Sequence, residues 1–126
     1  MELSDSHAPT AVREWVSRPL AWLQVVGVRE APDHALSHLD PGERDAILLA
    51  EEQNAALLLM DERDGTVIAR SRGLSVVGTL GILDAAAARG WIDLAVMFDR
   101  LQATSFRSPR RLMATMLEID AKRNKR

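Results

Sequence analysis

The 126-residue sequence contains no cysteine and few aromatic side chains: two phenylalanines, three tryptophans and no tyrosine. The lack of cysteine excludes disulfide bonds as a source of stability. Long hydrophobic runs are also missing, because the longest one, residues 55–60, is far too short to cross a bilayer. The first ten residues, MELSDSHAPT, lack the positive start and the apolar stretch of an export signal. We therefore expect a cytoplasmic protein with no membrane partner.

Charge is distributed unevenly along the chain. The net charge is -2, but residues 107–126 hold seven Lys or Arg and only two acids, so this segment carries +5 and the remainder carries -7. Such polarity matters if the partner is an anion. Basic side chains also favour helix C-termini and solvated tails. We expect residues 122–126 to form a solvated basic tail.

The pattern of apolar residues predicts an α/β domain. A hydrophobic content of 47% is ordinary for one folded unit of this length, so we expect a single domain over residues 1–126. Helices and strands are expected to alternate with short connections, which indicates a small parallel sheet flanked by helices with right-handed crossovers. The predicted helices are 9–16, 41–54, 65–72, 79–89 and two more capped by Asp93 and Ser108; the predicted strands are 22–28, 56–60 and 74–77.

Acidic residues gather where the predicted strands end. Asp61 directly follows the 56–60 strand, which reads as buried on both sides. Glu43 lies in the first turn of the preceding helix, and a crossover helix runs antiparallel to its strand. Because sites in open α/β sheets form beyond the carboxyl ends of strands, Glu43 and Asp61 can share one crevice.

Helix capping explains the same acids equally well. Asp40 and Glu43 have the spacing of a capping box, and Asp61 or Asp64 could be the N-cap of the helix that begins near Gly65. Spacing alone leaves both interpretations open.

Three motifs, read together, resemble a known family. They are LDPGERDAILLA at 39–50, LLLMDERDGTVIAR at 57–70 and GLSVVGTLGILDAAAARGWI at 73–92. Their order and spacing are similar to those of the PIN-like nuclease family, in the domain-of-unknown-function branch related to VapC-type toxins, over about residues 2–116. The resemblance implies a three-layer PIN-like fold with a small parallel sheet, of which this chain is the C-terminal three quarters or so.

The resemblance also implies a set of metal ligands. Glu43 and Asp61 match the family's catalytic acids, and Asp64 corresponds to a supporting acid. Glu2 resembles the acid that ends an earlier helix of the family, whereas Glu62 is expected to face solvent. These carboxylates would hold Mg²⁺ or Mn²⁺ and support hydrolysis of RNA phosphodiester bonds. Without metal, close carboxylates repel each other, so at least one should hold its proton more tightly.

The start of the chain departs from the family pattern. Family members open with a strand that ends in a metal-binding Asp, followed by two helices, and the resemblance begins only at Glu2. We therefore expect the domain to be N-terminally truncated. The loss of one carboxylate would weaken metal affinity, and the loss of a strand would expose sheet edges that could pair with a second copy.

Partners follow from the same resemblance. Relatives imply a homodimer and a cognate antitoxin, with RNA as the substrate. Arg63, Arg70 and Arg72 could contact its phosphates, although solvated arginines are as good an explanation. Thr66 stands where the family frequently has Arg, which argues against a phosphate contact at that position. With no aromatic platform for bases, we expect weak sequence selectivity.

Two other functions compete with the nuclease interpretation. The shortened chain could be a catalytically inactive PIN-like assembly or binding module. A phospho-accepting receiver fits less well, because the paired early acids and the later Lys-bearing strand that it needs are absent. His34 and His38 lie four residues apart in a predicted loop, a spacing that is more often incidental than a zinc site.

Overall fold

The computed structural model describes residues 6–18, 20–29 and 34–124. Contacts divide the chain into two compact units, residues 1–31 and 32–126. Glu2 lies outside the described residues. Among the described helices, none is long and apolar enough to span a membrane.

The first unit holds the predicted helix but not the predicted strand. Helix α1 (Thr10–Ser17) forms as expected. The strand predicted over residues 22–28 is wrong, because residues 23–29 have no regular secondary structure. Trp22 is 71% exposed and Val25 is 70% exposed. A strand needs a neighbour for its backbone N–H and C=O groups, and the described part of this unit offers none. β-Propensity alone therefore predicted an element that has no pairing partner.

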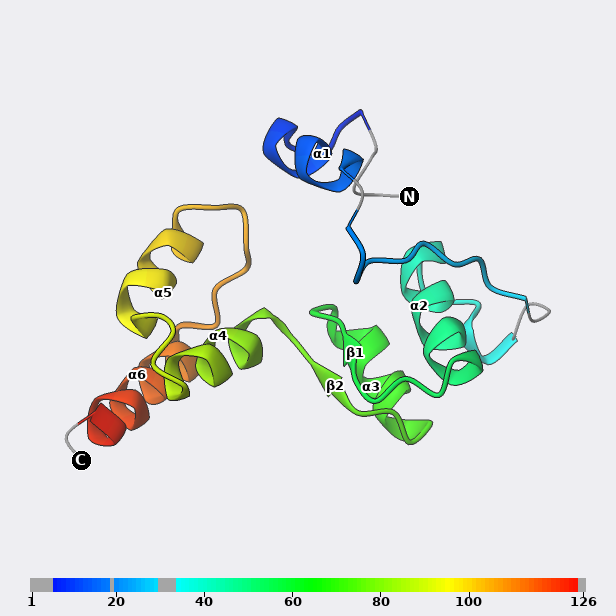
Figure 1. Cartoon of the computed structure of the whole chain (residues 1–126). Helices are drawn as coiled ribbons and strands as arrows, with labels where there is room; N and C mark the ends of the chain where they lie inside the picture. The colour runs from blue at the N-terminus through cyan, green and yellow to red at the C-terminus, as the bar shows by residue number, and fades with distance from the viewer. Residues whose placement is uncertain (1–5, 19, 30–33, 125–126) are drawn as a thin grey trace. The chain divides into compact units, whose positions relative to one another are not determined.

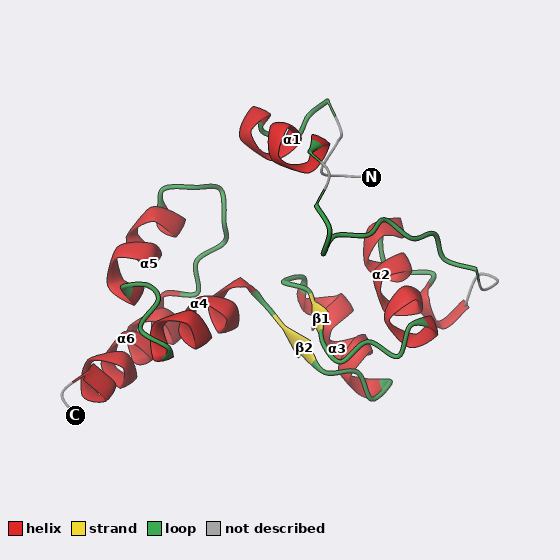
Figure 2. Ribbon diagram, viewed as in Figure 1, coloured by secondary structure: helices red, strands yellow, loops and turns green. Residues whose placement is uncertain are grey.

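The second unit is built on a two-stranded parallel sheet. After a short 3₁₀ turn, η2 (His34–Leu36), the order is α2 (Pro41–Glu52), β1 (Leu58–Leu59), α3 (Arg63–Ser71) and β2 (Val76–Val77). The two strands lie side by side (Figure 2), and Leu58 pairs with Val76 and Leu59 with Val77. The parallel α/β architecture is confirmed, with two strands among the described residues where three were predicted.

One face of the sheet is covered and the other is open. Leu58 is buried, together with Ile47 of α2 and Ala69 of α3. Leu59, which points to the opposite face, is 61% exposed, and Leu57 is 51% exposed. The prediction that this strand is covered on both sides is therefore wrong. A continuous apolar run identifies a strand but cannot show whether a second layer lies over it.

Three helices complete the second unit: α4 (Thr79–Ala88), α5 (Leu94–Gln102) and α6 (Arg110–Asn124). They pack on one another (Figure 1) around a cluster of buried apolar side chains, Leu80, Ala87, Leu94, Phe98 and Met113. Glycines with positive φ stand just after two helices, Gly73 at +83° and Gly90 at +74°, a backbone conformation that costs glycine least.

The two predicted helix caps near the C-terminal end fare differently. Asp93 caps α5 by accepting a hydrogen bond from the Val96 N–H at 3.2 Å. Ser108 does not cap α6; its hydroxyl donates to the Phe106 carbonyl, and the helix begins two residues later at Arg110. Ser108 and Pro109 are each compatible with the start of a helix. The sequence alone therefore could not show at which residue α6 begins.

The predicted basic tail begins inside a helix. Lys122 and Arg123 lie in the last turn of α6, which extends to Asn124. Arg123 bonds to Asp84 of α4 at 3.1 Å and to Asp120 at 3.4 Å. Asp120 is 8% exposed, so its charge is compensated where it is buried. Arg123 thus ties the last helix to α4.

Candidate metal and nucleic-acid site

Asp61 joins the end of β1 to the start of α4. Its Oδ1 accepts a hydrogen bond from the Thr79 backbone N–H at 2.7 Å, and its Oδ2 accepts one from the Thr79 hydroxyl at 2.6 Å. The N-cap residue of α4 is Gly78, which has no side chain to bond the free N–H groups of the first turn. Asp61 therefore caps α4 from 18 residues away, which fixes the carboxylate at the end of the strand.

The glycines of the GTLG motif make this approach possible. A Cβ on Gly78 would lie 2.6 Å from Asp61 Oδ1, and a Cβ on Gly81 would lie 2.5 Å from Val77 Cγ2. Both distances are shorter than Cβ atoms tolerate. One glycine thus admits the carboxylate and the other lets α4 lie close to β2.

Glu43 lies in a completed capping box at the start of α2. Asp40 Oδ1 accepts a hydrogen bond from the Glu43 N–H at 2.9 Å, and the Glu43 carboxyl is bonded in return by the Asp40 backbone. The capping interpretation is thus confirmed for this pair. Glu43 also lies close to α3, because a Cβ on Gly65 would lie 3.7 Å from Glu43 Cβ and 2.6 Å from Met60 Sδ. The first turns of α2 and α3 therefore meet beside the residue that precedes Asp61.

Electrostatics distinguish Glu43 from ordinary surface acids. Partial burial raises its pKa above the ordinary value of 4.5, and a side-chain hydrogen bond with Asp40 and the negative charges of Asp40 and Glu62 raise it further. Asp40 shifts the other way: the Glu43 N–H, which donates to it, lowers its pKa. Neither Asp61 nor Asp64 is among the causes of this shift, which arises from burial and from the acids that cap α2 and α3 rather than from the predicted set of metal ligands.

Neither Asp61 nor Asp64 caps α3, in contrast to the prediction. The N-cap is Glu62, whose carboxylate accepts a hydrogen bond from the Asp64 N–H at 3.3 Å. Glu62 is exposed as predicted, but it also helps to raise the pKa of Glu43. Asp64 lies in the first turn of α3 with its side chain exposed. The spacing of the acids could not reveal this arrangement because a longer Glu side chain replaces the common Asp cap.

A hollow of about 920 Å³ opens beside Asp61 and Glu62. Three arginines line it: Arg63 and Arg70 from α3, and Arg107 from the loop between α5 and α6. Arg70 also donates to the Val76 carbonyl at 3.5 Å. Sequence reasoning missed Arg107; its only signal was its place at the start of the basic segment. Most of the remaining lining is apolar and comes from β2, α4, α6 and the loops next to them, and Thr66 and Ser108 add polar groups.

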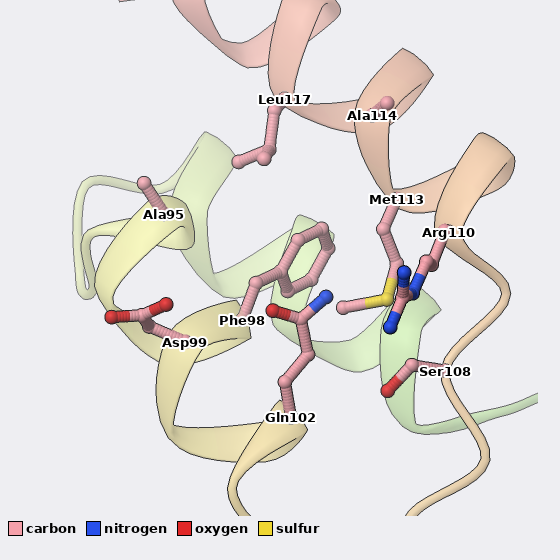
Figure 3. Close-up of a pocket in the computed structure, with 9 residues that line it drawn as sticks. All are labelled: Ala95, Phe98, Asp99, Gln102, Ser108, Arg110, Met113, Ala114 and Leu117. Atoms are coloured by element: carbon pink, nitrogen blue, oxygen red, sulfur yellow. The ribbon is translucent and has the colours of Figure 1, made fainter.

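A second hollow, of about 520 Å³, lies between α5 and α6 (Figure 3). Phe98 and Met113 point into it. None of the acids or arginines proposed from the sequence lines this hollow. The candidate site therefore belongs beside Asp61.

Arg72 is placed apart from the other predicted RNA contacts. It stands at the C-terminal end of α3, where its guanidinium holds both oxygens of Glu51 at 2.7 to 3.2 Å. This two-pronged ion pair joins the ends of α2 and α3. Arg72 does not line the hollow, so it is not retained among the proposed RNA contacts.

We expect Arg72→Ala to lower the free energy of unfolding by about 1 kcal/mol, because the pair is half-buried and bidentate. RNA affinity should stay unchanged. Urea unfolding and a binding titration measure the two quantities separately. A loss of affinity with no loss of stability would return Arg72 to the site.

Residues 2–122 match the family model of a PIN domain. The chain belongs to the PIN-domain family. This confirms the resemblance inferred from the three motifs, and with it a nuclease-type fold. No curated protein and no solved structure shows a significant match to the chain.

PIN domains in general depend on a divalent metal ion. The described residues of this PIN domain contain no group of three or more His, Asp or Glu side chains placed to hold a metal, His34 and His38 included. The available donors still suit Mg²⁺, which proteins commonly hold through one or two carboxylates plus water and substrate phosphates. Each Asp61 oxygen accepts a bond from Thr79 and keeps a further lone pair. Asp61 and Glu43 have suitable oxygen chemistry, but of the predicted ligands among the described residues Asp61 alone lines the hollow, and Glu43 and Asp64 do not.

The raised pKa of Glu43 gives a pH-dependent prediction for this PIN domain. The folded state holds the proton more tightly than the unfolded state, so stability falls as pH rises from 4.5 through the folded pKa. At neutral pH without divalent metal, we expect Glu43→Gln to be more stable than the wild type by roughly 0.5 kcal/mol. Glutamine keeps the hydrogen bonds of the capping box while removing the charge.

Urea unfolding in EDTA at pH 7 and pH 4 tests this expectation. The stability advantage of Glu43→Gln should largely vanish at pH 4, where Glu43 of the wild type is mostly protonated in both the folded and the unfolded state. An equal difference at both values would show that the carboxylate charge is not its cause.

Proposed function

We propose that this PIN domain is a metal-dependent ribonuclease of the toxin type, which hydrolyses RNA phosphodiester bonds with Mg²⁺ or Mn²⁺. The observation that carries the proposal is the position of Asp61, held at the carboxyl end of β1 beside a hollow lined by arginines. Acidic and basic side chains meet there as a metal-assisted phosphate reaction requires.

The proposed roles combine the position of Asp61 with the family resemblance. Asp61 and Glu43 are the best candidates to hold the ion, with Asp64 as a supporting acid and Glu2 carried over from the family resemblance. When bound, the ion supplies Lewis acidity toward the phosphate and activates water. A bound cation would offset the negative charges of Asp40 and Glu62 that raise the pKa of Glu43. Arg63 and Arg70 hold the RNA backbone by its phosphates, which positions the strand without reading its sequence.

A non-catalytic binding or assembly module is the second candidate. Two observations favour it: the described residues hold no three-ligand group, and both Asp61 oxygens are already bonded to Thr79. Such a module would keep the arginine-lined hollow but leave RNA intact.

Metal binding and cleavage separate the two candidates. Mn²⁺ affinity is measured by calorimetry for the wild type, for Glu43→Gln and for Glu118→Gln, whose carboxyl is exposed on α6 and serves as the matched control. Cleavage of a labelled RNA is followed with Mn²⁺ and with EDTA. We expect Mn²⁺-dependent cleavage, with affinity lowered in Glu43→Gln alone. RNA that stays intact under both conditions would favour the binding module.

Further properties implied by the family resemblance stay predictions. They are the toxin role, the cognate antitoxin, the homodimer and the cytoplasmic location.

A further inference from the structure

Arg107 lies beside Asp61 but has no role in the proposed function. It lies on the loop between α5 and α6, 44 residues from Arg63 in sequence, yet both line the hollow beside Asp61. Its side chain is exposed. Among the described residues, neither Arg107 nor Arg63 forms an ion pair or a side-chain hydrogen bond, and Arg70 donates only to a carbonyl at 3.5 Å.

Three cations around one hollow repel each other, and the carboxylates of Asp61 and Glu62 in the same lining offset at most two of the three charges. Elsewhere in this unit, half-buried arginines are neutralised: Arg72 by Glu51 and Arg123 by Asp84 and Asp120. Arg63, Arg70 and Arg107 are instead exposed to solvent and form no ion pair among the described residues, so they are open to an incoming anion. An extended anion with several charges suits them better than a single small ion, because they come from both ends of α3 and from a separate loop.

We propose that Arg107 is a phosphate-binding residue that completes a three-arginine rim, Arg63, Arg70 and Arg107, along which a nucleic-acid backbone crosses the hollow past Asp61. This assignment rests on the proposed function for the choice of anion. The α5–α6 loop then forms one wall of the substrate channel, and its position sets which phosphate lies nearest Asp61.

The lining of the hollow supports a strand rather than a free ion. Phe106, directly before Arg107, is partly buried against the α4–α6 core and lines the hollow with Leu112 of α6. A nucleotide presents a charged phosphate and an apolar base face together, so one unit can contact Arg107 and this apolar surface at once.

Binding of a labelled single-stranded RNA is measured by fluorescence anisotropy in EDTA, over a range of salt concentrations. Without metal no cleavage occurs, so the result is independent of catalysis. We expect Arg107→Ala to weaken binding by about tenfold and to reduce the slope of log affinity against log salt by roughly 0.7 to 1, as for one lost phosphate contact. Arg107→Lys should restore most of the slope.

Arg100→Ala is the matched control, since it removes one positive charge from the last turn of α5 without touching the hollow. Equal affinities for Arg107→Ala and Arg100→Ala, or a weaker affinity with an unchanged salt slope, would overturn the assignment. The two proposals fail in different ways. RNA binding that depends on Arg107, without cleavage in Mn²⁺, would reject the nuclease activity alone. RNA cleavage with no effect of Arg107→Ala on binding would reject the three-arginine rim alone.

Discussion

Replacing Asp61 with asparagine is expected to lower the rate of RNA cleavage by about 100-fold or more, since a lost metal ligand removes several kcal/mol of transition-state stabilisation. The fold should survive. Asparagine keeps an oxygen acceptor for the Thr79 N–H, and the Thr79 hydroxyl can rotate to accept from the new amide group. The measurement is an initial cleavage rate at saturating Mn²⁺, with circular dichroism to show that the variant is folded.

Thr79→Val separates the charge of Asp61 from its hydrogen bonds. This variant loses the hydroxyl that donates at 2.6 Å but keeps the backbone N–H that donates at 2.7 Å. Cleavage should fall far less than in Asp61→Asn. Wild-type cleavage by folded Asp61→Asn would remove Asp61 from the catalytic set, and the nuclease proposal would lose its main support.

Gly78→Ala is expected to lower the free energy of unfolding by about 1–3 kcal/mol, the usual cost of forcing extra volume into a packed site. The new methyl group would lie 2.6 Å from Asp61 Oδ1 and 3.4 Å from the Met60 carbonyl, so the carboxylate must move away from Thr79. Cleavage should decrease along with stability, because the same carboxylate is displaced. Urea unfolding and the cleavage assay measure the two effects.

Gly27→Ala provides the comparison for this variant. A Cβ at Gly27 meets nothing within 4 Å, so its stability should stay within about 0.5 kcal/mol of the wild type. If Gly78→Ala proved as stable as Gly27→Ala, the close approach of Asp61 to α4 would not be a constraint on the sequence.

Local signals were predictable from the sequence because their causes lie within a few residues. The start of α2 at Pro41 follows from Asp40 as N-cap, and the positive φ of Gly73 and Gly90 follows from helix endings. The family resemblance was likewise carried by continuous motifs. The coarse α/β class needed no more than the alternation of these elements.

Features that depend on contacts between residues far apart in the sequence could not be predicted from it. Residues 22–28 have strand propensity, but pairing requires a neighbour that propensity cannot supply. Arg72 was grouped with Arg70 although its partner, Glu51, is 21 residues away. Arg107 could be placed beside Asp61 only once the path of the α5–α6 loop was known.

The bond between Asp61 and Thr79 has a consequence for how the site can be observed. A cation that draws electron density from Asp61 weakens its hold on the Thr79 N–H, and an asparagine at 61 does so permanently. The nuclear magnetic resonance signal of the Thr79 amide proton should therefore shift upfield as Mn²⁺-free protein is titrated with diamagnetic Mg²⁺. One backbone atom of α4 thus serves as a natural sensor of events at the tip of the neighbouring strand.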